Sequence, residues 1–384
     1  MRQDGFVGGC VRHRASWLSR TPIHTGRVLC ALCRVVRCRR CRSPSVAGLI
    51  VRWGIIGAGR IAKKVGAAMQ TAPGHRITAV YGRRIDAARV LAQDFSAVAF
   101  DDIGALLTSQ RCDAVYVALP NHLHAPIALQ AIAAGLHVLV EKPLACTAAE
   151  VAQIYKAAQS AGVVVREGMM YQHHPQTTKT RELLASGAIG SIKQIHVGFG
   201  YRQDNPADIR MTERVGGGAI ADLGCYAVHY ARLMTSAAVT QVCGVGVWGG
   251  NQVDVRANAL CMLENDIDAT FTVSFVGGFF QNARIIGYDG VIEIERPFTI
   301  FPDRVSSIRL WRGAHFAQLE EIAIAPCNHF VEQAVAFAHA VAVPAAERIP
   351  PSLLDSYVNA QVIDAWRRSL TSGLREHIGQ QELQ

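Results

Sequence analysis

From residue 51 onward, short hydrophobic runs alternate along the chain with segments in which hydrophobic residues recur at helical spacing. This alternation is typical of βαβ units, which place strands side by side in a parallel sheet. The runs predict strands at 51–58, 77–82, 114–120 and 137–143, and the periodic segments between them predict helices. A doubly wound parallel sheet is therefore predicted for residues 51–170.

After residue 170 the pattern changes to that of an antiparallel sheet. Residues 191–201 carry hydrophobic side chains at alternate positions, which is the period of a half-buried strand. Segments 259–275 and 283–295 have the pattern of β-hairpins, and the second turns at Asp289-Gly290. Two helices are predicted at 328–341 and 353–370. We expect a second α/β domain over 171–372, followed by a tail at 373–384.

The distribution of charge separates the first 50 residues from the rest. The chain of 384 residues is half hydrophobic, and no hydrophobic run is long enough to cross a bilayer. Its net charge of +9 comes from residues 1–50, which hold ten arginines and one acidic residue. The remainder carries 29 basic and 29 acidic side chains, and this balance argues against nucleic-acid binding.

The first 50 residues also hold five of the eleven cysteines, four of them in two Cys-x-x-Cys pairs within 30–41. Only four residues separate the pairs, too few for a zinc ribbon or finger, so we expect no metal site. An organelle transit peptide is a second alternative. We expect a basic extension without a fold, with the working protein beginning near Leu49 or Val51. The other cysteines are scattered singly, which favours a cytoplasmic location.

A GxGxxA motif lies in GIIGAGRIA at 54–62, between a predicted strand and a predicted helix. In this context Gly57 forms the tight turn, Gly59 lets a pyrophosphate approach the backbone, and Ala62 lets helix and strand pack. The alternative is a plain tight turn. The flanking pattern favours dinucleotide binding.

The end of the second predicted strand distinguishes between dinucleotides. An acidic residue there binds the ribose 2′-hydroxyl of NAD, whereas a cation suits the 2′-phosphate of NADP. Arg83 and Arg84 follow this strand in YGRRID, and the first acidic residue is Asp86. The sequence therefore favours NADP, and Asp86 leaves NAD open.

Two further segments carry polar residues in a pattern that indicates a site. VEKP at 140–143 places Lys142 at the carboxyl end of a strand, where ligands gather in open α/β sheets, with Glu141 beside it to orient it. In the segment 216–234, Asp222, Tyr226 and His229 stand at i, i+4 and i+7. They are predicted to share one face of a helix.

These residues belong to motifs that make the chain from about 51 to 372 resemble the glucose-fructose oxidoreductase and inositol dehydrogenase (Gfo/Idh/MocA) family. The motifs are GIIGAGRIA, LPNHLHAPIALQAIAAGLHVLVEKPLA, MMYQHHPQT, ASGAIGSIKQI and GGGAIADLGCYAVH. The resemblance implies a Rossmann domain, then an α/β domain with a large, mostly antiparallel open sheet that commonly forms a dimer interface. Tyr226 stands where the inositol dehydrogenase branch has histidine, so the chain looks closer to dihydrodiol dehydrogenase, xylose dehydrogenase and glucose-fructose oxidoreductase.

The resemblance also implies roles for single residues. Lys142 and Tyr226 match the catalytic lysine and tyrosine of the family, Asp222 is expected to orient them, and Asn121 is expected beside the nicotinamide. The expected substrate contacts are Lys142, Arg210, Tyr226 and His229. The residues expected to bind the cofactor are Gly57, Gly59, Arg60, Ile61, Arg83, Arg84, Leu119, Asn121, His124, Glu141 and Lys142.

The expected function is that of an NADP-dependent oxidoreductase acting on CH–OH groups. It would transfer a hydride between nicotinamide and a hydroxyl-bearing carbon of a sugar, cyclic polyol or dihydrodiol. A free tyrosine has a pKa of about 10, so Tyr226 as base requires the positive charges of Lys142 and the nicotinamide to lower that value. In the alternative mechanism, Lys142 abstracts the proton directly and Tyr226 only orients the substrate.

The sequence also leaves a rival function open and predicts the partners of the protein. A regulator that senses NADP without turnover is the rival function. We expect a homo-dimer or tetramer through the second sheet, and no nucleic-acid or membrane partner. The histidine pairs His122 with His124 and His173 with His174 lie in motifs of a family that needs no metal, so no metal is expected there.

Overall fold

The computed structural model describes residues 50–250, 252–313, 317–343 and 351–379. The predictions made for residues 1–49 lie outside the described part of the chain. The first sheet has the order β3-β2-β1-β4-β5-β6, and all its strand pairs are parallel. Its strands are β1 (Val51–Ile56), β2 (His75–Tyr81), β3 (Val98–Phe100), β4 (Ala114–Val117), β5 (His137–Val140) and β6 (Val165–Glu167).

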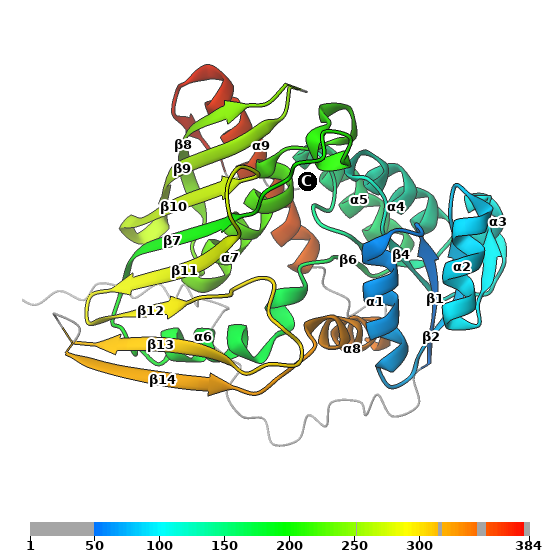
Figure 1. Cartoon of the computed structure of the whole chain (residues 1–384), viewed down its shortest axis with the longest axis horizontal. Helices are drawn as coiled ribbons and strands as arrows, with labels where there is room; N and C mark the ends of the chain where they lie inside the picture. The colour runs from blue at the N-terminus through cyan, green and yellow to red at the C-terminus, as the bar shows by residue number, and fades with distance from the viewer. Residues whose placement is uncertain (1–49, 251, 314–316, 344–350, 380–384) are drawn as a thin grey trace, which may run out of the picture. The chain divides into compact units, whose positions relative to one another are not determined.

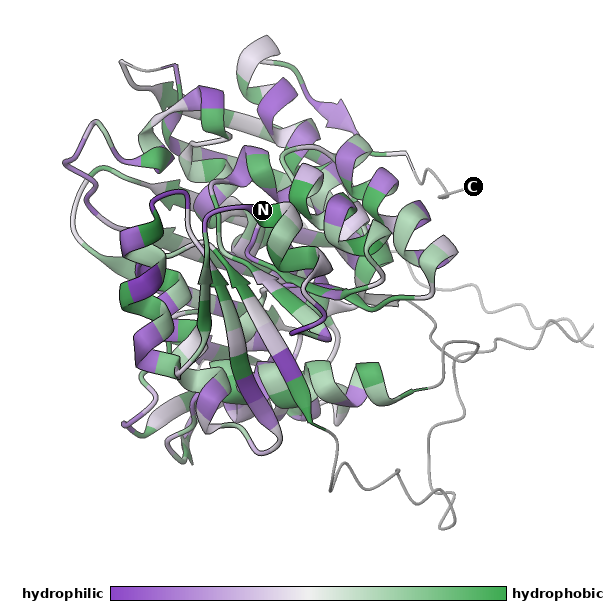
Figure 2. Cartoon of the chain, turned by 90° about the vertical axis from the view of Figure 1, so that its right-hand side faces the viewer, coloured by the Kyte–Doolittle hydropathy of each residue, from purple (hydrophilic) through white to green (hydrophobic). Residues whose placement is uncertain are grey.

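Helices cover both faces of this sheet, as the alternating pattern predicts (Figure 1). They are α1 (Arg60–Thr71), α2 (Ile85–Phe95), α3 (Ile103–Thr108), α4 (His124–Ala133) and α5 (Ala148–Ala161). Helix α1 turns Ala62, Val65 and Met69 toward the sheet, where all three are fully buried. Figure 2 shows hydrophobic and hydrophilic residues sharing the helices around the parallel strands. Burial of one face therefore fixes each helix on the sheet.

The second sheet has nine strands in the order β14-β13-β12-β11-β7-β10-β9-β8-β15, and only β7 and β10 pair in parallel. The pairing confirms the mostly antiparallel sheet that the family resemblance implies. Its strands are β7 (Ile192–Gly200), β8 (Val239–Trp248), β9 (Asp254–Leu263), β10 (Ile267–Ser274), β11 (Phe280–Gly287), β12 (Gly290–Ile294), β13 (Ser306–Arg312), β14 (Gln318–Ile324) and β15 (Glu376–His377).

Both predicted hairpins are present. Strands β9 and β10 form the first, and β11 and β12 form the second, which turns at Tyr288 and Asp289. The predicted tail is wrong in part, because β15 at 376–377 pairs with β8 and so extends the sheet. The division into domains at residue 170 stays a prediction.

The helices of the second half are α6 (Pro175–Ala185), α7 (Cys225–Thr235), α8 (His329–Ala342) and α9 (Pro351–Ser372). Helix α8 packs beside α1, and α9 packs against α5 as well as against β8. One hydrophobic cluster contains Trp53 of β1, Phe337 of α8 and Trp366 of α9. The two sheets are therefore held by a shared core, so the elements at their junction keep fixed positions.

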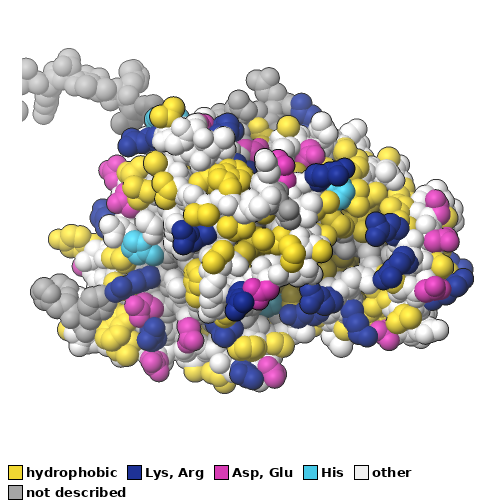
Figure 3. All heavy atoms as spheres, turned by 45° about the horizontal axis from the view of Figure 1, so that its top comes forward, with side chains coloured by type: hydrophobic (Ala, Val, Ile, Leu, Met, Phe, Trp, Pro, Cys, Tyr) yellow, Lys and Arg dark blue, Asp and Glu magenta, His cyan; other side chains and the backbone are white. Residues whose placement is uncertain are grey.

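None of the described helices is both long and apolar enough to span a bilayer. On the face drawn in Figure 3, basic and acidic side chains are interspersed with hydrophobic ones. This distribution agrees with the balanced charge of the sequence after residue 50.

A group of histidines is buried where α8 meets the 3₁₀ turn Met170–His173. His174 is 1% exposed and His329 is 4% exposed, and their ring centroids lie 6.1 Å apart. Burial lowers the pKa of His329 to about 3, helped by the charges of His174 and Lys64. Burial also lowers the pKa of His173 to about 4, with Arg166 adding to the effect. These imidazoles are therefore neutral in the folded protein at neutral pH.

Acid should destabilise the fold through His329. The unfolded chain binds a proton at the ordinary histidine pKa, whereas the folded chain resists it, so stability falls as pH drops below about 6.5. At about pH 4.5 the loss due to this residue is about 3 kcal/mol. Urea unfolding at several pH values should show a flatter acid limb for His329→Phe than for wild type. The matched control is His377→Phe, at an exposed histidine. An unchanged limb in His329→Phe would contradict the assignment.

Candidate functional site

A cleft of about 840 Å³ lies at the carboxyl ends of β1, β4 and β5, facing α7 and the segment before it. This is the edge at which open α/β sheets bind ligands. All eleven residues predicted to bind the cofactor line the cleft. Of the four predicted substrate contacts, Lys142, Arg210 and Tyr226 line it and His229 does not.

The glycine motif has the shape that a pyrophosphate requires. Gly57 adopts φ +119°, and a Cβ there would lie 2.3 Å from the carbonyl oxygen of Ala118, so only glycine fits. Gly59 precedes α1 without any side-chain cap, and a Cβ there would meet nothing within 4 Å. Free backbone N–H groups and open space at a helix start suit an anionic phosphate. These residues therefore fit a dinucleotide.

The strand-end arginines are available to a ligand. Arg83 and Arg84 are both exposed beyond the end of β2, and both line the cleft. Asp86 does not line it, and its carboxylate contacts Arg89 at 3.4 Å within α2. Arg83 and Arg84 therefore lie where the ribose 2′ position of a dinucleotide would lie, and Asp86 lines an adjoining hollow with Gly59 and Arg84.

The loop after β4 is fixed by polar contacts to other loops of the cleft. Asn121 donates from Nδ2 to the carbonyl oxygen of Gly216 at 2.8 Å. The two ring nitrogens of His124 lie 2.7 Å from the Pro143 oxygen and 2.8 Å from the Leu119 oxygen. A ring held between two carbonyls shapes the loop and does not reach out to a metal. Among the described residues there is no cluster of three or more potential metal ligands.

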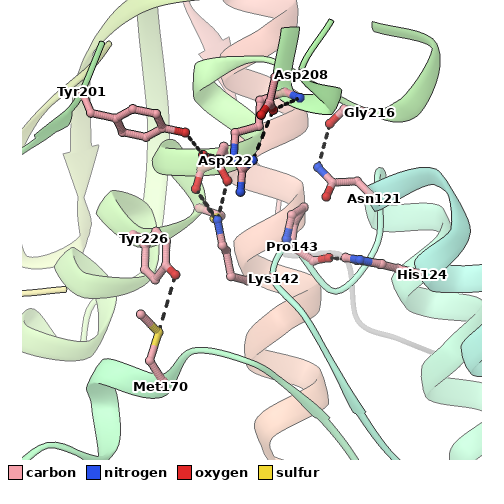
Figure 4. Close-up of polar contacts among 12 residues, drawn as sticks. Asn121, His124, Lys142, Pro143, Met170, Tyr201, Asp208, Gly216, Asp222 and Tyr226 are labelled. Atoms are coloured by element: carbon pink, nitrogen blue, oxygen red, sulfur yellow. Dashed lines mark hydrogen bonds and ion pairs between the residues drawn. The ribbon is translucent and has the colours of Figure 1, made fainter. Parts of the chain in front are cut away.

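Lys142 and Asp222 form the central contact of the cleft (Figure 4). The Nζ of Lys142 donates to Oδ1 of Asp222 at 2.5 Å and to its carbonyl oxygen at 2.8 Å. The other carboxylate oxygen accepts from the Tyr201 hydroxyl at 2.9 Å and from Nε of Arg210 at 3.1 Å. One carboxylate therefore connects the end of β5 to β7 and to the loop that carries Arg210.

These contacts determine the charges of the pair. Burial alone would raise the pKa of Asp222, but Lys142 and Arg210 hold it at about 2. Burial alone would lower the pKa of Lys142, but the carboxylate of Asp222 raises it above the ordinary lysine value. Lys142 is therefore an ammonium and Asp222 a carboxylate at neutral pH. An ammonium has three N–H groups, so one remains for a ligand.

Glu141 does not orient the lysine, contrary to the prediction. Its Oε1 accepts from the Tyr116 hydroxyl at 2.5 Å, and Asp222 holds Lys142 instead. Burial raises the pKa of Glu141. Both residues lie just beyond the end of β5, and each side chain is taken by a different partner.

Tyr226 lies beside Lys142 in the same cleft, and its side chain is 5% exposed. Nζ of Lys142 lies 4.8 Å from the centre of the Tyr226 ring. The Tyr226 hydroxyl donates to Sδ of Met170 at 3.5 Å (Figure 4). A thioether is a weak hydrogen-bond acceptor, so the Tyr226 hydroxyl can give up this contact for a stronger acceptor on a ligand.

The acidity of Tyr226 differs from the prediction. Burial raises the pKa of its phenol well above the ordinary value, and the charges of Glu141 and Asp222 add to the effect. The protein's own groups therefore do not lower this pKa, mainly because the phenol is buried. Tyr226 is a neutral phenol at neutral pH.

His229 lies outside the cleft, so the prediction that it contacts substrate is not supported. Its Nδ1 meets the Tyr171 hydroxyl at 2.5 Å and its Nε2 lies 3.0 Å from Asp355. Tyr226 and His229 both lie in the regular helix α7, after the π-helical turn at Ile220–Gly224. His229 lies nearly one turn farther along the helix axis than Tyr226, where Tyr171 and Asp355 contact its ring.

Tyr201 belongs to the site, although it was not predicted. It lines the cleft and donates to Asp222, and burial raises its own pKa so that it stays a phenol. The only signal in the sequence was alternation along 191–201, which placed Tyr201 on one face with Phe199. Alternation identifies a face of a strand but not the polar partner of a hydroxyl.

Known proteins share this architecture. A model of the oxidoreductase family with an NAD-binding Rossmann fold matches residues 51–169, and a model of the GFO/IDH/MocA C-terminal domain matches residues 177–293. An uncharacterized oxidoreductase of Rhizobium meliloti is 32% identical over 335 residues, or 84% of this chain and 98% of that protein. A D-xylose 1-dehydrogenase (NADP(+)) of Haloferax volcanii is 30% identical over 331 residues, with the same two coverages.

Among solved structures, a 3-ketoreductase from Actinomadura kijaniata in complex with NADP and TDP-benzene is similar to this chain. The two superpose with a TM-score of 0.79 at 29% identity, over 84% of this chain and 98% of the other. The matches span both sheets and the cleft between them. The chain therefore belongs to the Gfo/Idh/MocA family of NAD(P)-dependent oxidoreductases.

Proposed function

We propose that this protein is an NADP(H)-dependent oxidoreductase that interconverts a hydroxyl and a carbonyl on a sugar, cyclic polyol or dihydrodiol. The observation that carries the proposal is the pairing of two proton donors in one cleft. Lys142 has an N–H group left over, and Tyr226 has a hydroxyl bonded only to a thioether. Both lie beside the residues that fit a dinucleotide.

The chemistry divides between the cofactor and the chain. Bound nicotinamide supplies or accepts the hydride. Lys142 and Tyr226 bind the reacting oxygen and move its proton. Either Lys142 transfers the proton directly, or Tyr226 transfers it with Lys142 beside it. Asp222 keeps Lys142 in place and keeps it charged. Arg210 and Tyr201 hold Asp222 from its other side.

The protonation states favour one direction at neutral pH. Lys142 and Tyr226 both carry their protons, so they are ready to donate to a carbonyl oxygen as it becomes an alkoxide. Alcohol oxidation requires one of them to lose its proton first. Carbonyl reduction is therefore the direction that we propose at neutral pH, and oxidation should gain as pH rises.

The cofactor preference rests on Arg83 and Arg84. Both guanidinium groups are exposed at the cleft where a 2′-phosphate would lie, and charge-assisted contacts to phosphate are strong. The xylose dehydrogenase relative uses NADP(+) by its name, and the A. kijaniata ketoreductase binds NADP in its solved structure.

A homo-dimer or tetramer through the nine-stranded sheet and a cytoplasmic location are part of the same proposal. On the sheet, Glu293 lies between Arg284 and Arg309 at 3.4 Å from each. Leu260 is exposed on β9, where its two neighbours are buried, and Leu319 is exposed on β14, whose first four residues are all exposed. Paired charges and exposed leucines on one sheet are features that an interface with a second copy of the chain can use.

The six cysteines in the described part of the chain are free, which supports the proposed cytoplasmic location.

Removing the proton donors should separate turnover from binding. Tyr226→Phe keeps the ring and its packing, so NADPH affinity should stay within about twofold while turnover falls by about 10² or more. Lys142→Met should lose a similar factor, and Asp222→Asn less. Nicotinamide absorbance would follow reactions with D-xylose, other sugars, polyols, trans-dihydrodiols and keto-sugars.

The matched control for Tyr226→Phe is Tyr288→Phe, at a tyrosine that is 77% exposed on a turn. Near-full activity of Tyr226→Phe would contradict the assigned mechanism. If NADPH binds but no sugar, polyol, diol or keto-sugar is converted, the protein is a nucleotide-sensing regulator instead.

Arg83→Ala should narrow the preference for NADP over NAD, mainly by weakening NADP. One charge-assisted contact contributes about 1.5 to 3 kcal/mol, so the dissociation constant of NADP should rise about tenfold or more. Titration calorimetry with both dinucleotides measures this. Arg89→Ala is the control, because Arg89 contacts Asp86 within α2 and does not line the cleft. Equal affinities for NADP and NAD in wild type would refute the preference.

A further inference from the structure

The helical segment that carries Asp222 and Tyr226 is held at its start by a carboxylate from the second sheet. Asp254 is the first residue of β9, and its side chain is almost fully buried at 4% exposed. Its Oδ2 accepts from the backbone N–H of Ile220 at 2.6 Å. Ile220 begins the π-helical turn that contains Asp222, so the carboxylate acts two residues ahead of the site.

The turn before Ile220 is fitted closely around the same carboxylate. Gly218 adopts φ +109°, and a Cβ there would lie 2.2 Å from Oδ1 of Asp254. The N–H of Gly218 also donates to the carbonyl oxygen of Arg210 at 2.8 Å. Arg210 in turn contacts Asp222 through Nε. Asp254 therefore touches both the start of the helical segment and the turn that positions Arg210.

A buried carboxylate is a costly way to make this contact. Burial raises the pKa of Asp254 to about 6, although the N–H groups of Ile220 and Ala219 and the charge of Arg367 on α9 act in the opposite direction. Asp254 therefore binds its proton more tightly in the folded state than in the unfolded chain. At neutral pH, where the group is mostly ionised, its charge reduces the free energy of unfolding. Because the buried charge of Asp254 lowers the stability of the fold, we infer that its role is to position the backbone that it contacts.

We propose that Asp254 is a positioning residue for the reaction: it fixes the start of the π-helical turn, so that Asp222 reaches Lys142 and Tyr226 faces the cleft. The inference rests on the proposed function, because it concerns the residues that carry that function. A carboxylate that accepts from the first N–H of a helical segment fixes where that segment begins, as a capping side chain does.

The experiment compares Asp254→Asn with a matched control, Asp364→Asn. The carboxylate of Asp364 accepts the N–H of Ala148 at the start of α5 at 2.8 Å, and burial raises its pKa too. Asparagine keeps the size of the side chain but turns an amide donor toward backbone N–H groups. Hydrogen exchange of the peptide 218–226, NADPH affinity, melting temperature and turnover are measured for each.

In Asp254→Asn the amides of 218–226 should exchange about tenfold faster, and turnover should fall about tenfold or more, since small misplacements of reacting groups are costly. NADPH affinity should stay within about twofold, and melting should shift by only a few degrees because a buried charge is removed. Asp364→Asn should leave exchange in 218–226 and turnover unchanged. The proposal is overturned if exchange and turnover of Asp254→Asn match wild type, or if NADPH binding and melting collapse together with turnover.

The wild-type protein gives a second test that needs no variant. Burial makes the folded Asp254 hold its proton more tightly than an exposed carboxyl would, so exchange in 218–226, corrected for the intrinsic effect of pH, should slow relative to α2 at 85–95 between pH 7 and pH 5. Constant relative protection over that range would overturn the proposal. If wild type converts no substrate, the proposed function fails, and the exchange measurements still decide whether Asp254 fixes the segment.

Discussion

The ion pair of Lys142 and Asp222 is the interaction on which the rest of the site depends. Lys142 comes from the end of the parallel sheet, and Asp222 comes from the helical segment packed on the second sheet. Their side chains are almost fully buried, so the pair forms only when both sheets are docked as they are here. Breaking such a pair would leave a buried charge without a partner, which is strongly destabilising. Docking of the sheets and assembly of the site are thus one event.

The same pair determines the chemistry. Asp222 keeps Lys142 charged, and burial, with the negative charges of Glu141 and Asp222 adding to it, keeps Tyr226 a neutral phenol. A site built in this way holds two acids side by side, which suits donation to an oxygen that is gaining negative charge. Trp53 of β1 packs against Phe337 of α8 in the hydrophobic core that the two sheets share.

The sequence predicted those features that follow from local patterns. Hydrophobic runs located β1, β2, β4 and β5 of the parallel sheet but not the three-residue β3 and β6, and both hairpins were predicted. The glycine motif located Gly57, whose backbone no other residue can adopt. All predicted cofactor residues line the cleft, because each follows a strand end of one sheet.

The predictions that failed depended on geometry that a pattern does not contain. The face shared by Asp222, Tyr226 and His229 was predicted from spacing alone, and His229, nearly one turn beyond Tyr226 on α7, lies against Tyr171 and Asp355 outside the cleft. Of the two residues expected to orient Lys142, Asp222, 80 residues away, contacts it and the neighbouring Glu141 does not. Tyr201 joined the site through a contact between β7 and the helical segment, for which no spacing rule exists.

The most direct test of the account is the pH dependence of turnover in Asp222→Asn compared with wild type. Asp222 raises the pKa of Lys142, and burial without that carboxylate lowers it. The account predicts that carbonyl reduction by Asp222→Asn loses activity at a clearly lower pH than reduction by wild type, and that alcohol oxidation gains activity over the same interval. Superimposable pH profiles of the two proteins would contradict the claim that this ion pair sets the acid of the site.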